Sequence, residues 1–307
     1  MSEFNGLEVW RGGVNTWECD DMGHMNVRFY VARAVEGLVG LAAAMGLDGA
    51  FRTGADATVL VKEQHIRFLR EARPGAALHM IAGLVSLGEH EARVLQMLIH
   101  SQTGEIAATF QTVIGHVTSR EGRAFPWSDR TAALAQGLSM AIPDRAAPRS
   151  LSLSPVRSVA SLAEADRLNL ARLAAGAFSA AECDVFGRMR PEIFIGRLSD
   201  GVPGLRRVVG EPVERSADVG GAVVEYRLLH LDWPKAGDRF EIRSGLIGVS
   251  QNAQHIVHWM LDPTTGRAWG AAEAVAVSLD LRARKLIPLD DEARARISLS
   301  IVPGLSL

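Results

Sequence analysis

Cysteine is scarce in this sequence, and no spacing typical of a metal site occurs. Only Cys19 and Cys183 are present among 307 residues, and they form no CxxC pair. Such usage indicates neither a disulfide framework nor a zinc centre. The nine histidines also lack the spacing that a zinc or iron site requires. We therefore expect free thiols, no metal ion and no organic cofactor.

Long hydrophobic runs are missing as well. The longest nearly apolar stretch, residues 37–47, is well short of the roughly 20 residues that a membrane-spanning helix needs. Residues 1–13 have neither the basic region nor the apolar region of a signal peptide. These absences predict a soluble, cytoplasmic protein with no membrane partner.

Neither sign of charge is in excess. The chain has 33 basic and 35 acidic residues and a formal net charge of −2, so no global field attracts nucleic acid. It also lacks a G-x-S-x-G elbow, a P-loop and a dinucleotide fingerprint. These absences leave a serine hydrolase of that type, an ATPase and a Rossmann dehydrogenase without support.

What the chain does contain is an internal repeat. The segment ECDDMGHM at residues 18–25 recurs as ECDVFGRM at residues 182–189, with five of eight positions identical. Cys183 follows Cys19 by 164 positions, and two later turn glycines, Gly75 and Gly104, recur 162 positions on as Gly237 and Gly266. Landmarks in the same order with a two-residue shift indicate a duplication.

Both copies show the same order of predicted elements. Asn26 is a suitable N-cap for a helix whose apolar face runs from Val27 to Met45 and which ends at Gly46. In the second copy Pro191 fits the first helical turn, and we expect that helix to stop near residues 201–203. Four strands are predicted after each helix, at 58–69, 76–87, 91–100 and 106–118, and at 222–231, 239–249, 254–261 and 268–281.

The repeat also sets the domain organisation. A length of 307 residues suits two domains of about 150 residues. Residues 132–158 are rich in Ala, Pro and Ser and carry no strong period. We therefore predict an N-terminal domain at 1–130, a linker at 131–158 and a C-terminal domain at 159–307.

The first loop and its helix resemble the hotdog-fold acyl-CoA thioesterase family (4-hydroxybenzoyl-CoA thioesterase-like). The family's loop pattern appears here as Asp20, Gly23, His24 and Asn26, with Tyr30 one helical turn later. The resemblance implies an α+β fold of two tandem hotdog domains, each a long helix wrapped by an antiparallel sheet. We expect the two halves to pack as an intramolecular pseudo-dimer, and a homo-oligomer of the chain stays open.

The resemblance also implies a reaction, the hydrolysis of an acyl-CoA thioester, with CoA as part of the substrate. A carboxylate placed before a helix, such as Asp20, acts as general base or as nucleophile. Backbone amides at the helix N-terminus, from Gly23 to Met25, are expected to polarise the carbonyl. His24 and Asn26 complete the predicted catalytic set, with orientation, capping or packing as their alternative roles.

The second loop keeps Asp184 and Gly187 but has Arg188 and Arg190 in place of the first loop's His24 and Asn26. An arginine beside a carboxylate forms an ion pair that weakens it as a base. We therefore expect a degenerate second site, although the arginines also suit CoA phosphates.

The resemblance further points to residues that contact substrate. Tyr30 belongs to this set, with packing of the helix as its alternative role. Polar residues of the first strand after the helix belong to it too, although alternation of charged and apolar residues also fits a strand with one face in solvent. These strand residues are Glu63, Gln64, His65 and Arg67.

Two other functions remain compatible with these patterns. Tandem hotdog proteins also serve as acyl-ACP thioesterases, and a catalytically silent acyl-CoA-binding module would keep the groove without needing Asp20. Release of CoA from a panel of acyl-CoAs separates hydrolysis from binding alone.

Overall fold

The computed structural model describes residues 6–208 and 218–307. The chain forms two compact units. The first contains residues up to Pro148 together with Asp184–Glu192, and the second contains Arg149–Cys183 and Ile193–Leu307. The loop of the second copy therefore belongs by its contacts to the first unit.

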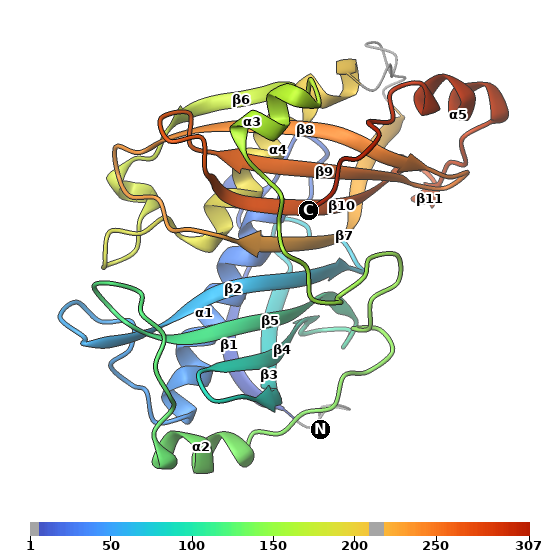
Figure 1. Ribbon diagram of the computed structural model, residues 1–307. Helices are drawn as coiled ribbons and strands as arrows, with labels where there is room; N and C mark the ends of the chain where they lie inside the picture. The colour runs from blue at the N-terminus through green and yellow to red at the C-terminus, as the bar shows by residue number, and fades with distance from the viewer. Residues whose placement is uncertain (1–5, 209–217) are drawn as a thin grey trace. The chain divides into compact units, whose positions relative to one another are not determined.

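The first unit is a five-stranded antiparallel sheet with one long helix, visible in the blue to green part of the ribbon (Figure 1). The strand order is β1-β3-β4-β5-β2. Its elements are β1 (Leu7–Gly13), the 3-10 helix η1 (Thr16–Glu18), α1 (Val27–Ala44), β2 (Ala57–Phe68), β3 (Ala77–Leu87), β4 (Glu91–His100), β5 (Ile106–Thr118) and α2 (Asp129–Gln136).

Helix α1 packs on one face of this sheet against β1, β3 and β4. Asn26 caps it, because its side chain accepts a hydrogen bond from the amide of Arg28. A Cβ added at Gly37 would lie 2.7 Å from Met80 Sδ, and one at Gly40 would lie 2.8 Å from the Val9 carbonyl oxygen. The small residues of α1 therefore serve close contact between helix and sheet.

The opposite face of the first sheet is covered by the segment after α2. Met140 and Ala146 are buried in a cluster with Ile81, Leu95 and Met97, and the amide of Met140 donates to the Leu84 carbonyl. Burial of these side chains contributes roughly 25 cal/mol per Å² of apolar surface. Residues 131–148 of the predicted linker thus belong to this unit, and residues 149–158 belong to the second unit.

The second unit repeats this plan with the strand order β7-β10-β9-β8-β6, and β11 pairs with β10. Its elements are α3 (Leu162–Arg167), β6 (Ala171–Ala177), η2 (Ala180–Glu182), α4 (Pro191–Val208), β7 (Val219–His230), β8 (Arg239–Val249), β9 (Gln254–Leu261), β10 (Ala268–Asp280), β11 (Lys285–Leu286) and α5 (Asp291–Ser298).

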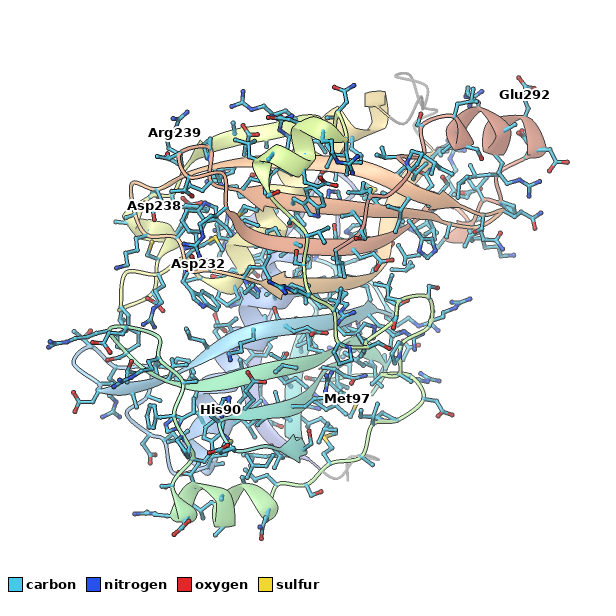
Figure 2. All side chains as sticks on the ribbon, viewed as in Figure 1. His90, Met97, Asp232, Asp238, Arg239 and Glu292 are labelled. Atoms are coloured by element: carbon cyan, nitrogen blue, oxygen red, sulfur yellow. The ribbon has the colours of Figure 1, made fainter. Side chains whose placement is uncertain are left out.

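A chain segment covers the outer face of this sheet too. Leu305 and Leu307 are buried in a cluster with Trp259, and the Trp259 indole donates a 3.0 Å hydrogen bond to the Ser306 carbonyl. In contrast, the side chain of Glu292 on α5 is exposed (Figure 2). The residues after α5 cover this face together with Ile297, the buried residue of the helix.

The predicted long helices and the eight strands after them are confirmed, mostly to within one residue, and so is the α+β class. The predicted end of the second helix was wrong. Helix α4 continues through Pro203 to Val208, because Leu198 and Leu205 on either side of the proline are buried and a proline removes only one helical hydrogen bond. Strands β1 and β6 were not predicted.

One pair of positions shows how the two copies diverged together. In the first copy the Tyr30 hydroxyl accepts a 3.0 Å hydrogen bond from the amide of Ala72. With the repeat offset of 164, Tyr30 corresponds to Phe194. With the later offset of 162, Ala72 corresponds to Pro234. Phenylalanine has no hydroxyl and proline has no N–H. The second copy therefore lacks both members of this bond.

We predict a strong coupling between Tyr30 and Ala72. Tyr30→Phe is expected to destabilise the protein by about 1–3 kcal/mol, because it leaves the buried amide of Ala72 without its acceptor. Ala72→Pro is expected to destabilise by a similar amount. The double variant, which copies Phe194 and Pro234, should cost clearly less than the two single changes added together, as measured by chemical denaturation. Additive losses would contradict the coupling.

Candidate functional site

The candidate loop connects η1 to α1. The amide of Asp20 donates to the His24 carbonyl and the amide of Gly23 donates to the Asp20 carbonyl, both at 3.0 Å. Gly23 has φ = +75°, a conformation that favours glycine. The loop thereby folds back on itself and presents Asp20 and His24 on the same side.

Asp20 and His24 form a close pair. One carboxylate oxygen of Asp20, Oδ2, lies 3.2 Å from His24 Nδ1, and both side chains are largely buried, at 19% and 15% exposure. The other oxygen, Oδ1, accepts a 3.0 Å hydrogen bond from the Met22 amide. Asp20 is thus fixed in orientation at the entrance to helix α1.

The pair shifts the pKa of each group toward its charged form. Burial by itself would raise the pKa of Asp20, but the hydrogen bond and charge of His24, with backbone amides of the loop, outweigh it and lower that pKa. The hydrogen bond to Asp20 raises the pKa of His24 against the effect of burial, and nearby Glu71 adds to the rise. Each group of the pair therefore favours the charged form of the other.

The amides that we expected to polarise the carbonyl are already used within the protein. Gly23 N–H donates to the Asp20 carbonyl and Met25 N–H donates to Ala72 at 2.7 Å, while the His24 amide bonds to the Asp20 carboxylate. The tight loop thus pairs its own donors, and polarisation of the carbonyl by these amides stays a prediction that these hydrogen bonds do not favour. The Val27 amide occupies the first helical position, where the helix itself supplies no acceptor.

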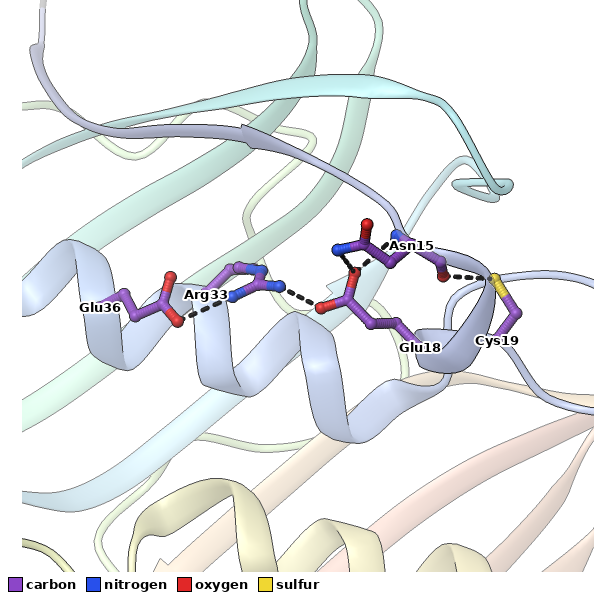
Figure 3. Close-up of polar contacts among 5 residues, drawn as sticks. All are labelled: Asn15, Glu18, Cys19, Arg33 and Glu36. Atoms are coloured by element: carbon purple, nitrogen blue, oxygen red, sulfur yellow. Dashed lines mark hydrogen bonds and ion pairs between the residues drawn. The ribbon is translucent and has the colours of Figure 1, made fainter.

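A buried carboxylate anchors this loop to the helix (Figure 3). Glu18 is 3% exposed and accepts a 2.7 Å hydrogen bond from the Asn15 amide. It also pairs with Arg33 of α1, which in turn pairs with Glu36 at 2.7 Å. Our sequence analysis missed this pair, although Glu182 and Arg197 recur at the same offset of 164 and pair at 2.5 Å.

Asn26 and Tyr30 have structural roles. Asn26 is the helix cap described above, and its own amide donates to the Glu18 carbonyl at 2.8 Å. Tyr30 is buried, packs edge-on against Phe68 at 5.2 Å between ring centroids, and its pKa is raised by burial. Its hydroxyl is paired with Ala72, so the structure favours packing over a role in substrate binding.

The second loop has the same backbone arrangement as the first. The amide of Asp184 donates to the Arg188 carbonyl at 2.7 Å, and the amide of Gly187 donates to Asp184 at 3.0 Å. Gly187 has φ = +78°. The Asp184 carboxylate accepts hydrogen bonds from the amides of Phe186 and Arg188, both at 2.9 Å. The duplication thus preserved the loop while its side chains changed.

The expected ion pair between Asp184 and the two arginines is not formed within the described part of the chain. The Arg188 guanidinium donates to the Ser119 carbonyl and is 4% exposed, so it is not offered to a CoA phosphate either. Arg190 Nε instead lies 3.2 Å from the carboxylate of Glu192. Arg188 holds the second loop on the first unit, a role that sequence spacing could not reveal.

The four candidates on β2 do not act as a group. Alternation along the strand places Gln64 on the same face as Phe68, which contacts Tyr30 of α1. Gln64 is fully buried and its amide nitrogen donates to Thr112 Oγ1 at 3.4 Å. Glu63, His65 and Arg67 belong to the opposite face. The described contacts join none of the four to Asp20 or His24.

Arg67 binds the protein's own chain. Its guanidinium donates to the carbonyls of Asp144, Arg145 and Ala147 at 2.9–3.3 Å. Gln111, opposite His65 in the neighbouring strand, donates to Ala146 at 2.8 Å. The prediction that Arg67 contacts substrate is therefore replaced by a role in fastening residues 144–147.

Three further features bear on the site. Both cysteines are free thiols. Within residues 6–208 and 218–307, no group of three or more His, Cys, Asp or Glu side chains is arranged to hold a metal ion. None of the helices described there is both long enough and apolar enough to span a membrane.

Comparison with known families decides the assignment. The family model described as "Thioesterase-like superfamily" matches residues 14–135 and 179–297, one segment in each copy. The chain belongs to the thioesterase-like superfamily. Each matched segment contains one loop, one long helix and the strands after it, so this thioesterase is a tandem double hotdog and a thioester hydrolase.

Solved structures of similar architecture cover most of the chain. A protein from Lactobacillus plantarum assigned as an oleoyl thioesterase has a TM-score of 0.65 and 12% identity over 89% of this chain and 96% of its own. The 12:0-ACP thioesterase of Umbellularia californica has a TM-score of 0.63 and 12% identity, over 87% of this chain and 92% of its own. An acyl-ACP thioesterase from Bacteroides thetaiotaomicron has a TM-score of 0.62 and 11% identity, over 87% of this chain and 96% of its own. At these identities the likeness shows the fold alone. None of the curated protein sequences compared with this thioesterase matches it.

We predict that Arg67→Ala weakens the fold without weakening substrate binding. Loss of hydrogen bonds from a charged group to backbone carbonyls should cost about 1.5–3 kcal/mol, measured by chemical denaturation. Arg70→Ala is the control, because Arg70 is exposed and its single ion pair with Glu105 is worth at most about 1 kcal/mol. A raised KM for Arg67→Ala with unchanged stability would restore the substrate-binding interpretation.

Proposed function

We propose that this thioesterase hydrolyses an acyl-CoA to the free acid and CoA, with Asp20 as general base or nucleophile. The observation that supports this most is the Asp20–His24 pair at the entrance to α1, with Asp20 Oδ2 3.2 Å from His24 Nδ1. A carboxylate that stays ionised is the group that the attack requires. Of the two described loops, only the first pairs its aspartate with a histidine.

The reaction needs few groups from the protein. With Asp20 as base, a water oxygen bonds to the thioester carbon while its proton passes to the carboxylate, and the C–S bond then breaks. The proton finally moves to the released thiolate of CoA. With Asp20 as nucleophile, the carboxylate forms an anhydride that water opens. Both routes give the same products.

The developing oxyanion needs a donor, and two groups in this loop supply one. His24 uses Nδ1 for Asp20, which leaves Nε2–H of the imidazolium for the substrate oxygen. The Val27 amide lies at the positive end of the α1 dipole. These groups replace the Gly23–Met25 amides in our proposal, because those amides already have acceptors.

The carrier of the acyl group has a second candidate. Two of the solved structures that match over most of this chain are named as thioesterases of acyl-ACP. This supports acyl-ACP as an alternative substrate, although the likeness itself is one of fold. The identity of the acyl chain and the identity of its carrier are separate questions, and one assay addresses both.

A substrate panel tests the proposal. Acyl-CoAs and acyl-ACPs of matched chain length are incubated with the protein, and released thiol is measured with a thiol-reactive dye. We expect release from acyl-CoA. Release from acyl-ACP alone would transfer the proposal to the carrier-protein substrate. Binding of acyl-CoA without release of CoA would identify a catalytically silent binding module.

We predict that Asp20→Asn lowers kcat/KM for acyl-CoA hydrolysis by at least about a hundredfold. This is the usual scale for loss of a general base or nucleophile. Asparagine is nearly isosteric and can still accept the Met22 amide bond, so the melting temperature should change little. A folded and fully active Asp20→Asn enzyme would refute the assignment.

Asp184→Asn is the matched control, because Asp184 occupies the same backbone position but has no histidine partner at the His24 position. We expect its rate to fall far less than that of Asp20→Asn. Equal losses in the two variants would show two working sites and contradict the proposed asymmetry.

We also predict a fall in kcat/KM on the alkaline side that depends on His24. The lowered pKa of Asp20 keeps it ionised, so no acidic limb is expected above about pH 5. The raised pKa of His24 keeps its proton past the ordinary value of 6.5, and the rate should fall as pH rises through that higher pKa. His24→Gln should be slower and lack this limb. An unchanged pH profile in His24→Gln would contradict the role of the imidazolium.

A further inference from the structure

A buried histidine in the second unit has no role in the site described so far. His230 is the last residue of β7 and is 7% exposed. The turn that follows contains Asp232, labelled in Figure 2, and then Trp233. The His230 ring stacks on Trp233 at 5.2 Å between centroids with an angle of 8°.

Both ring nitrogens of His230 are buried without a hydrogen-bond partner in the described part of the chain. The other fully buried imidazole of this sheet, His258, has Nδ1 2.7 Å from Ser244 Oγ. An unpaired buried polar group costs about 1–3 kcal/mol, and most such groups in folded proteins have a partner. His230 therefore needs an explanation that His258 does not.

Packing does not require a histidine at this position. His230 corresponds to Phe68 of the first copy, and each is the last residue of its strand. Phe68 packs edge-on against Tyr30 at 5.2 Å, and His230 packs edge-on against Phe194 at 5.8 Å. A phenylalanine thus satisfies the same packing geometry. The two ring nitrogens add polar atoms that no hydrogen bond within the described residues satisfies.

His230 contacts the long helix of the second copy through Phe194. Phe194 lies in the first turn of α4, which begins at Pro191 directly after the loop that repeats the Asp20 motif. In the first copy the equivalent turn of α1 directly follows the loop to which we assign the reaction. His230 therefore packs against the first turn of the long helix of the second copy.

We propose that His230 is a binding group for a hydroxyl on an acyl chain held at the second copy. This inference rests on the proposed function, because it takes an acyl thioester as the ligand. It assigns the second copy a role in recognition rather than in hydrolysis.

The properties of the imidazole favour a neutral hydroxyl over a charged group. Burial lowers the pKa of His230 to about 4, so the ring is neutral at pH 7 and offers one donor and one acceptor. An anion placed there would face no positive charge on the ring and would lose its hydration. A hydroxyl both donates and accepts, so it pairs with the ring in either tautomer.

Binding to the Asp20→Asn protein tests the proposal without hydrolysis of the ligand. The probes are butanoyl-, octanoyl- and dodecanoyl-CoA, each compared with its 3-hydroxy and its terminal hydroxy derivative by titration calorimetry. We expect at least one hydroxylated probe to bind at least about tenfold more tightly than its parent, the scale of one buried hydrogen bond. His230→Phe, which copies Phe68, should remove this preference and leave the affinity of the parent unchanged.

Two further variants separate recognition from packing. His230→Gln retains a donor and an acceptor and should keep part of the preference. His258→Gln copies Gln96 at the equivalent position of the first copy and should keep all of it. Preference that survives in His230→Phe, or no preference or no binding in any pair, would overturn the inference. Hydrolysis by the unmodified enzyme is measured separately, so a failure of the proposed reaction is distinguished from a failure of this site.

Discussion

The buried carboxylate of Glu18 is the interaction on which the candidate site depends. It accepts hydrogen bonds from Asn15 and pairs with Arg33 of α1, while the Glu18 carbonyl receives the amide of Asn26 at the helix cap. One residue thus joins the chain before the loop, the helix and the end of the loop. A charge this deeply buried is strongly destabilising once its partner is removed. The orientation of Asp20 follows from this anchor.

The duplication kept this anchor and changed the groups around it. Glu182 is bound by Ser179 and Arg197 in the same way, and both loops retain their left-handed glycine. The residue four positions after the aspartate differs, however. His24 faces the carboxylate of Asp20, whereas the guanidinium of Arg188 reaches the Ser119 carbonyl. The buried ion pair is thus common to both copies, whereas the residue after the loop glycine makes a different contact in each.

The repeat and the alternation of apolar residues predicted most of the fold, because helix and strand periodicity is a local property of the sequence. Strand β1 escaped prediction because its residues are half-buried or exposed and give no clear alternation. The hydrogen-bond partners of long side chains could not be predicted for another reason. Arg67 and Arg188 end on backbone carbonyls of residues 144–147 and 119, and carbonyls carry no signature in sequence. For the same reason, residue identity located the Asp20 loop but did not show which amides the loop had already used.

The assignment of residues 184–192 to the first unit has a consequence for synthesis of the chain. Domains of a growing polypeptide generally fold as units, starting from the N-terminus. Here the first unit lacks the Arg188 contact to Ser119 until the ribosome has added the forty residues from Pro148, the end of its continuous part, to Arg188. The N-terminal half therefore leaves the ribosome incomplete, and translation of the second copy completes it. A gene encoding the first copy alone would therefore omit residues 184–192 of this unit.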